Sequence, residues 1–171
     1  DKLEYGHKIL ETLDECNQYW HSYAPRIKEQ LDYAFKCFDS FVESYEFIEN
    51  NMEIIDYGCG QGGASIRFLD KFYQDFKTYI SKIKLIEPSS LALQRARRTL
   101  EFYSSDIQIV AINKKLNHVT HKELETDINQ TYIHLFSNIL DVEGFDLDEL
   151  FSKIVKIQGY HFFIAVSMDT T

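Results

Sequence analysis

Residues 52–63 read MEIIDYGCGQGG, and their types and order suit the binding of a nucleotide-like ligand. An apolar run that contains Asp56 leads into glycines at positions 58, 60, 62 and 63. Glycine lacks Cβ, so it permits a sharp turn from a strand into a helix and lets the backbone approach a ligand closely. Gly58, Gly60 and Gly63 also match the dinucleotide-binding spacing G-x-G-x-x-G, which has little specificity by itself.

Two carboxylates distinguish between the possible ligands. Glu87 follows the next apolar run, KIKLI, where it is placed to accept hydrogen bonds from ribose hydroxyls. Asp56 would repel a pyrophosphate in a partly dry site, because Coulomb energies rise as the dielectric constant falls. S-adenosylmethionine (SAM) carries a positive sulfonium and a positive ammonium instead, and a nearby carboxylate favours both. We therefore expect a cationic adenosine ligand.

Strand and helix patterns alternate after residue 50. Strands are expected at 52–57, 82–87 and 107–112, from residue 131, and at 160–167, with helices between them; one runs through Phe68, Leu69, Phe72, Phe76 and Ile80, and a short one covers 121–127. This alternation predicts an α/β, Rossmann-like, doubly wound, mainly parallel sheet of about five strands with helices on both faces. Ligands of such sheets bind beyond the carboxyl ends of the strands.

The first fifty residues read as helix. Apolar residues recur every three or four positions from Ile27 to Ile48, including Val42 and Tyr45, and Pro25 suits the first turn of that helix. We expect a helical extension over residues 1–50 that packs on a core at 51–171. Tyr19, Trp20 and Tyr23 precede this helix, and an aromatic stripe of this kind is more typical of a core than of a lid over a ligand.

The segment D-Y-G-C-G-Q-G (56–62) resembles motif I of class I SAM-dependent methyltransferases, and L-I-E-P-S (85–89) is similar to that family's second motif. The order of elements from about residue 19 to 167 is also similar. The resemblance implies methyl transfer from SAM, with S-adenosylhomocysteine (SAH) as product. The implied cofactor-binding residues are Asp56 near the ammonium, the glycine loop Gly58, Cys59, Gly60 and Gly62 around the methionine part, Glu87 and Pro88 at the ribose, Asn113 near the adenine, and Phe136 and Ser137 facing the methyl group.

The segment F-S-N-I-L-D (136–141) lacks the Asn/Asp-Pro-Pro-aromatic signature of amino methyltransferases that act on DNA bases, which disfavours that reaction. The sequence does not identify a catalytic base. His134 and Asp141 flank the appropriate strand end, but His134 is expected to point into a strand face.

The composition indicates which methyl acceptors and which cellular location to expect. The net charge of −9 should repel a nucleic-acid backbone, so a small molecule or a protein is favoured as methyl acceptor. Three separated cysteines predict reduced thiols, and scattered histidines predict no metal site. The sequence has no run of about 20 apolar residues, so we expect no membrane span and a cytoplasmic location.

The expected fifth strand, YHFFIAVS, is apolar on both faces, which is typical of an interior strand. In the family two further strands ordinarily lie beside it, and only four residues follow here. We therefore expect a homodimer, an N-terminal segment or a larger parent chain to cover this edge.

Two other functions stay open. The chain could be a non-catalytic SAM-binding or scaffold module of a larger protein, which turnover measurements would distinguish. It could also bind an NAD-type dinucleotide as an oxidoreductase, which Asp56 disfavours.

Overall fold

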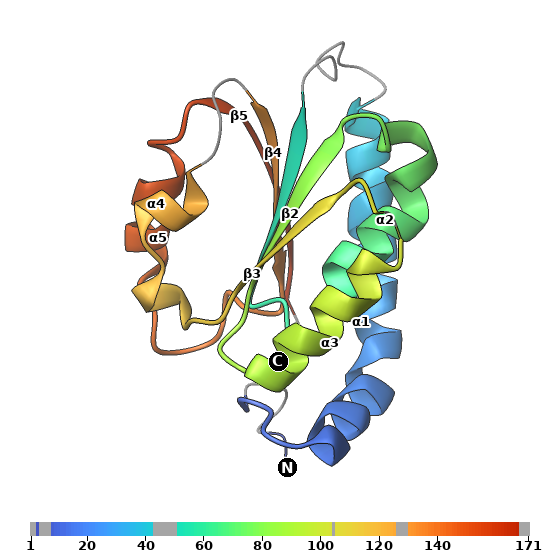
Figure 1. Ribbon diagram of the computed structural model, residues 1–171, viewed down its shortest axis with the longest axis vertical. Coiled ribbons are helices and arrows are strands. Elements are labelled where there is room, and N and C mark those ends of the chain that lie inside the picture. The colour runs from blue at the N-terminus through green and yellow to red at the C-terminus, as the bar shows by residue number, and fades with distance from the viewer. Residues whose placement is uncertain (1–2, 4–7, 43–50, 104, 126–129, 168–171) are drawn as a thin grey trace.

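A five-stranded, wholly parallel sheet forms the centre of the protein (Figure 1). The computed structural model describes residues 3, 8–42, 51–103, 105–125 and 130–167. The strand order is β3-β2-β1-β4-β5. The strands are β1 (Met52–Tyr57), β2 (Ile80–Ile86), β3 (Gln108–Ile112), β4 (Gln130–Ser137) and β5 (Gly159–Val166). The predicted doubly wound fold is confirmed, and the strand order reverses between β1 and β4.

Helices cover both faces of the sheet (Figure 1). One face carries α1 (Leu13–Val42), α2 (Gly63–Phe76) and α3 (Ser90–Glu101). The other carries α4 (His121–Leu124) and α5 (Leu147–Ile154), and a short 3-10 turn, η2 (Leu116–His118), precedes α4. Across the described part of the chain, every helix is too short or too polar to cross a bilayer.

The burial of each strand follows its place in the sheet. All six residues of β1 are buried, and β4 is buried at every residue except its last, because helices lie over both of their faces. The outer strands β3 and β5 are mostly half-buried or exposed. Between the sheet and α1 and α2 lies an aromatic cluster in which Phe35 and Phe38 each contact Phe68 and Phe72 with ring centroids 5.5–6.1 Å apart.

The expected start of the first helix is wrong. Helix α1 begins at Leu13, and Pro25 lies in its interior rather than in its first turn. A capping box fixes the start: Glu15 N–H donates to Thr12 Oγ1 (3.2 Å), and Thr12 N–H donates to Glu15 Oε2 (3.1 Å). Pro25 has no N–H for the carbonyl of His21, but both residues are exposed, so water can serve that carbonyl.

Smaller differences occur at other element ends. Ile80 begins β2 and does not belong to α2, α4 ends at Leu124, and β4 ends at Ser137. The predicted stripe residues Tyr45 and Ile48, the proposed domain boundary near residue 50 and the predicted helix end at 127 lie outside the described residues.

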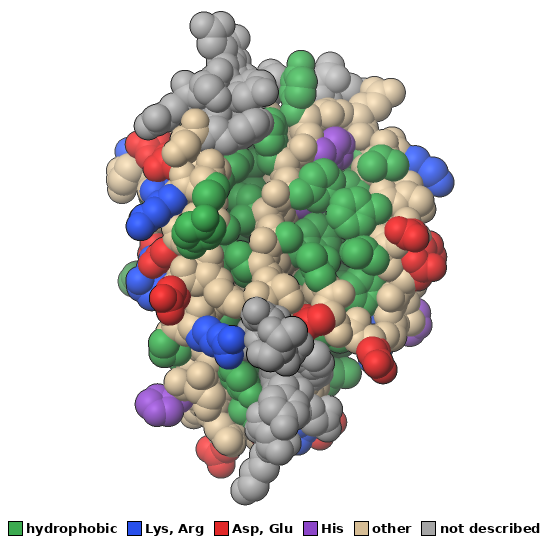
Figure 2. All heavy atoms as spheres, turned by 180° about the vertical axis from the view of Figure 1, so that it is seen from behind, with side chains coloured by type: hydrophobic (Ala, Val, Ile, Leu, Met, Phe, Trp, Pro, Cys, Tyr) green, Lys and Arg blue, Asp and Glu red, His purple; other side chains and the backbone are tan. Residues whose placement is uncertain are grey.

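Strand β5 is the edge strand of the described sheet, not an interior one. It pairs with β4, and the described residues place no strand on its outer side. Tyr160 and Phe163 are 59% and 42% exposed. Figure 2 shows apolar side chains gathered on this side of the molecule. A groove of about 660 Å³ runs between α1 and β5, which we call the β5 groove; residues 161–166 form one wall, and Tyr33 and Phe38 belong to the other.

Candidate functional site

The loop that joins β1 to α2 occupies the carboxyl edge of the sheet, where the strand order reverses. Gly58, Gly60 and Gly62 have φ of 63°, 51° and 81°, a left-handed conformation that side chains with a Cβ rarely adopt. A Cβ on Gly58 would lie 2.6 Å from Ile139 Cδ1, so the loop packs closely against the segment that follows β4. Backbone conformation therefore favours glycine at all three positions, and close packing adds to this at Gly58 and Gly62.

Replacing Gly62 by Ala should destabilise the protein more than replacing Gly60. Both substitutions carry a strain of about 1 kcal/mol from positive φ. At Gly62 the new Cβ would also lie 2.9 Å from Ala96 Cβ on α3, whereas nothing lies within 4 Å of a Cβ at Gly60. We expect Gly62→Ala to lose roughly 1–3 kcal/mol more in urea unfolding than Gly60→Ala. Equal losses would contradict the close packing of α2 on α3.

Asp56 is fully buried at the end of β1. Its Oδ2 accepts hydrogen bonds from Ser65 Oγ–H (2.7 Å) and Ser65 N–H (3.2 Å) in the first turn of α2. Its Oδ1 is buried without a hydrogen-bond partner among the described residues. Burial raises the pKa of Asp56 to about 7, the Ser65 hydrogen bonds oppose this rise, and repulsion by Glu87 adds to it.

Glu87 joins the glycine loop to the end of β2. Its Oε2 accepts from Gly60 N–H (3.0 Å), and its Oε1 accepts from Ser89 N–H (2.8 Å). Burial raises its pKa, and the two backbone hydrogen bonds oppose that rise. Asn113 supports this corner from behind, because its Nδ2 donates to the carbonyl oxygens of Glu87 and Pro88, at 2.9 Å each.

Two cavities meet at the glycine loop. The first, the Glu87 cavity, has a volume of about 240 Å³, and its walls include Glu87, Pro88 and Leu116. The second, the α1 cavity, has about 510 Å³ and lies between α1 and α2. The residues that line both are Tyr19, Gly58, Gly60 and Ser137. A ligand that crosses the loop would therefore contact both cavities.

The structure brings six of the ten predicted residues to these cavities: Gly58, Cys59, Gly60, Glu87, Pro88 and Ser137. The other four do not line the cavities. Asp56 and Gly62 fix the start of α2, and Asn113 holds the backbone of residues 87 and 88. Phe136 is buried in the core, stacked on Tyr57 with ring centroids 4.5 Å apart.

Helix α1 contributes residues that the sequence did not assign to the site. Tyr19 lines both cavities and Trp20 lines the α1 cavity, and both lie within α1 instead of before it. Gln61 Nε2 donates to the carbonyl of Cys16 (2.8 Å) and so ties α1 to the glycine loop. Burial, with a smaller effect of Glu87, raises the pKa of Tyr19 to about 12, so its hydroxyl stays protonated at neutral pH.

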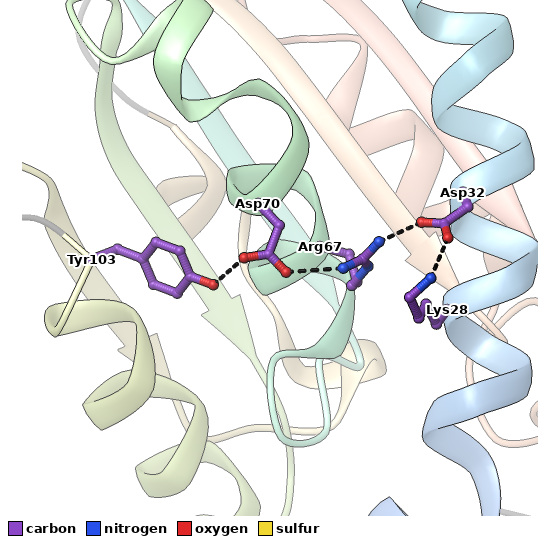
Figure 3. A network of polar contacts seen from close by, with 5 residues as sticks. All are labelled: Lys28, Asp32, Arg67, Asp70 and Tyr103. Carbon is purple, nitrogen blue, oxygen red and sulfur yellow. Dashed lines mark hydrogen bonds and ion pairs between the residues drawn. The ribbon is translucent and has the colours of Figure 1, made fainter.

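A network of charged side chains supports the α1 cavity on the side away from the loop (Figure 3). Asp32 accepts from Lys28 Nζ and from Arg67, both at 2.6 Å, and Arg67 also donates to Asp70 at 3.0 Å. The Tyr103 hydroxyl donates to Asp70. The network joins α1, α2 and the turn after α3, and it contains as many carboxylates as cations.

Neither predicted candidate for a base lies at the loop as a free group. His134 is fully buried in β4, where its Nδ1 lies 3.0 Å from the Tyr57 hydroxyl and its Nε2 lies 2.9 Å from His161 Nδ1. Burial, and to a lesser extent His161, lowers the pKa of His134 to about 3. Asp141 is exposed beyond the end of β4.

No protein-family model and no curated protein sequence matches this chain. Among solved structures, a SAM-dependent methyltransferase from Clostridium acetobutylicum superimposes with a TM-score of 0.51 at 14% identity, over 86% of this chain and 56% of that one. A SAM-dependent methyltransferase from Leishmania major gives a TM-score of 0.49 at 18% identity, over 94% of this chain and 58% of that one. Geranyl diphosphate C-methyltransferase from Streptomyces coelicolor, solved with Mg²⁺, geranyl diphosphate and SAH, gives 0.44 at 15% identity, over 80% and 46%.

The chain thus spans about half the length of these structures. At such identities the likeness concerns the fold. The parallel β3-β2-β1-β4-β5 sheet and the glycine loop after β1 agree with this likeness. The chain has the Rossmann-like α/β fold of the SAM-dependent methyltransferases.

Proposed function

We propose that the chain binds SAM across the glycine loop and serves methyl transfer to an acceptor. One observation carries the proposal: the Glu87 carboxylate lines a cavity beside a loop of positive-φ glycines, at the carboxyl edge of a sheet whose order reverses there. This combination supplies acceptors for ribose hydroxyls and a backbone that a ligand can approach.

The residues of the Glu87 cavity fit the adenosine part of SAM. Each Glu87 oxygen accepts one backbone N–H, and a carboxylate oxygen has a second lone pair that a ribose hydroxyl can use. Pro88, Ala92 and Leu116 offer apolar surface for the adenine. The methionine part would extend along Gly58 and Gly60 towards Ser137.

The charges near the loop suit a cation better than a pyrophosphate. The Asp56 carboxyl group already takes the Ser65 N–H in the first turn of α2, where a dinucleotide phosphate would bind. Asp56 and Glu87 also repel each other, which contributes to the raised pKa of Asp56. A positively charged ligand would relieve that repulsion, and an anion would increase it. Asp56 would attract the ligand electrostatically from behind the loop, without contacting it.

Bound SAM supplies a methyl group on a sulfonium that is already a good leaving group. The chain's part is then to hold the acceptor atom in line with that methyl group, and positioning of this kind is worth roughly 7–11 kcal/mol. Tyr19 lies at the junction of the two cavities, but its pKa of about 12 makes its hydroxyl a positioning group at neutral pH.

Calorimetric titration of SAM, SAH and NAD⁺ tests the proposal. We expect SAM and SAH to bind and NAD⁺ to give no heat of binding. Glu87→Gln should weaken SAM roughly ten- to hundredfold, since it removes the charge that strengthens the ribose hydrogen bonds. The control is Glu101→Gln on the exposed surface of α3, which should leave the affinity unchanged. Binding of NAD⁺ but not of SAM would contradict the proposal.

A second candidate function is a SAM-binding module whose acceptor site needs another chain or segment. The exposed, apolar edge of β5 favours it, because such an edge invites strand pairing. Transfer of a labelled methyl group to a broad panel of acceptors distinguishes the two functions. Sedimentation of the chain tests whether a second copy covers β5. Tight SAM binding without transfer, in a monomer, would favour the module.

A further inference from the structure

The α1 cavity has more room than the methionine end of SAM requires. Its volume of about 510 Å³ lies in the range of cavities that enclose small molecules of drug size. The cavity begins at the same loop residues, Gly58 and Gly60, that line the Glu87 cavity.

The wall of the α1 cavity is mainly apolar on the sides formed by the two helices. Helix α1 contributes Trp20, Ala24 and Ile27, and α2 contributes Ala64 and Ile66. Trp20 is 41% exposed and is also the only tryptophan of the chain. A large aromatic side chain that is half open to a cavity offers a flat apolar contact surface.

The charged residues of the cavity neutralise one another. Lys28, Arg67 and Asp70 line it, and all three belong to the network in which Asp32 is the fourth charge (Figure 3). A phosphate or carboxylate ligand would have to compete with Asp32 and Asp70 for the two cations. An uncharged ligand leaves the network intact.

We infer that the α1 cavity is the methyl-acceptor pocket and that its acceptor is an uncharged, largely apolar small molecule. The inference rests on the proposed function. The acceptor would lie against Trp20, with its nucleophilic atom directed to the junction formed by Tyr19, Gly58, Gly60 and Ser137. An electron pair of that atom forms the bond to the methyl carbon, the carbon–sulfur bond breaks with its pair left on sulfur, and the proton of the acceptor atom passes to water.

Energy transfer from Trp20 to N-phenyl-1-naphthylamine, a neutral apolar fluorophore, tests the pocket. Because the chain has a single tryptophan, the transfer reports on occupancy near α1. We expect saturable binding that Ala24→Phe weakens at least fivefold, because the added ring fills the cavity. Ile27→Phe is a second filling variant in case the first does not fold. Ser22→Phe adds the same ring to an exposed position of α1 and should leave binding unchanged.

The chemical class has its own matched probe. The compound 1-anilinonaphthalene-8-sulfonate has the same ring system and an added negative charge, and it should bind at least tenfold more weakly. Equal or tighter binding of the sulfonate would overturn the assignment to an uncharged ligand.

Two further outcomes would overturn the pocket itself. One is absence of saturable transfer in the wild type. The other is transfer that both filling variants leave unchanged while Tyr33→Asp, in the β5 groove, abolishes it.

Calorimetry with SAM separates this inference from the proposed function. If Ala24→Phe binds SAM like the wild type, the filled space belongs to the acceptor. If its SAM affinity falls with that for the neutral probe, the space belongs to the cofactor and the inference is wrong. Failure of the wild type to bind SAM would overturn the proposed function, whereas the probe measurements decide whether the cavity takes an apolar ligand.

Discussion

The Asp56→Asn variant should lose about 3 kcal/mol of stability between pH 6.5 and pH 4, a loss that the wild type largely avoids. The loss comes from His134, whose pKa of about 3 in the folded protein lies far below its value of about 6.5 in an unfolded chain. Below pH 6.5 the His134 side chain binds a proton in the unfolded state but not in the folded state. Stability then falls by about 1.4 kcal/mol for each pH unit until the pH reaches about 3.

Asp56 has the opposite effect in the wild type. Its pKa of about 7 in the folded protein lies above the value of about 3.9 in an unfolded chain. As the pH falls from 7 to 4, the folded state binds a proton that the unfolded state does not, so the folded state gains about 1.4 kcal/mol per unit. The two slopes nearly cancel between pH 6.5 and pH 4. Removing one titrating group therefore reveals the pH dependence that the other causes.

The hydrogen bonds of His134 allow its ring to be neutral. The carbonyl of Ile157 only accepts, so His161 Nε2 carries a hydrogen, and with both rings neutral His161 Nδ1 accepts from His134 Nε2–H. His134 Nδ1 then accepts from the Tyr57 hydroxyl. Every member of this chain is satisfied without a net charge.

Urea unfolding of three proteins between pH 4 and pH 7 tests this balance. Relative to the wild type, Asp56→Asn should lose stability as the pH falls, and His134→Gln should gain it. The comparison concerns slopes, so a constant loss from either substitution does not affect it. Parallel curves for the three proteins would show that the two groups do not titrate as the structure indicates.

Binding of SAM should release about half a proton at pH 7 and should become roughly twentyfold tighter from pH 5.5 to pH 8. Half of the Asp56 carboxyl groups are protonated near pH 7 in the free protein. The sulfonium and ammonium of SAM, which its single carboxylate offsets only in part, would favour the ionised form of Asp56 and lower its pKa; the stated values assume that this pKa falls to about 5. A ligand that binds better to the ionised form gains affinity as the pH rises.

Calorimetry in buffers of different ionisation enthalpy measures the released proton directly. SAH keeps the ammonium but lacks the sulfonium, so it should release less. Asp56→Asn should abolish most of the release. Proton uptake on binding, or release that Asp56→Asn does not change, would contradict a role for Asp56 in favouring a cation.

The sequence was sufficient for the sheet because its strands are short apolar runs with turn residues between them. The central strands β1 and β4 lie within two residues of their predicted starts, and their burial explains the continuous apolar pattern. Pro25 predicts a later start for α1 than the structure has, because the T-x-x-E capping box at Thr12–Glu15 is the stronger signal for a helix start.

Part of the geometry of the candidate site follows from the topology. The glycine loop and Glu87 each come directly after one of two neighbouring strands, so the contact between Gly60 and Glu87 could be inferred from the sequence. The orientation of Asp56 could not, because it depends on Ser65 in the next helix. The α1 cavity also depends on tertiary contact, since Trp20 and Ile66 come from helices that only the folded chain brings together.

The edge of β5 shows a different limit. An apolar pattern on both faces indicates that something covers a strand, but it does not say whether the cover is the same chain. In the described residues β4 lies on one side of β5, and the covering of its other side stays a prediction.

A crystal structure of the chain with bound SAH would show where the cofactor lies. We expect both ribose hydroxyls within hydrogen-bond distance of the Glu87 carboxylate and the homocysteine along Gly58 and Gly60. The proposed site would be contradicted by SAH bound away from this loop, or by a ribose that leaves Glu87 untouched.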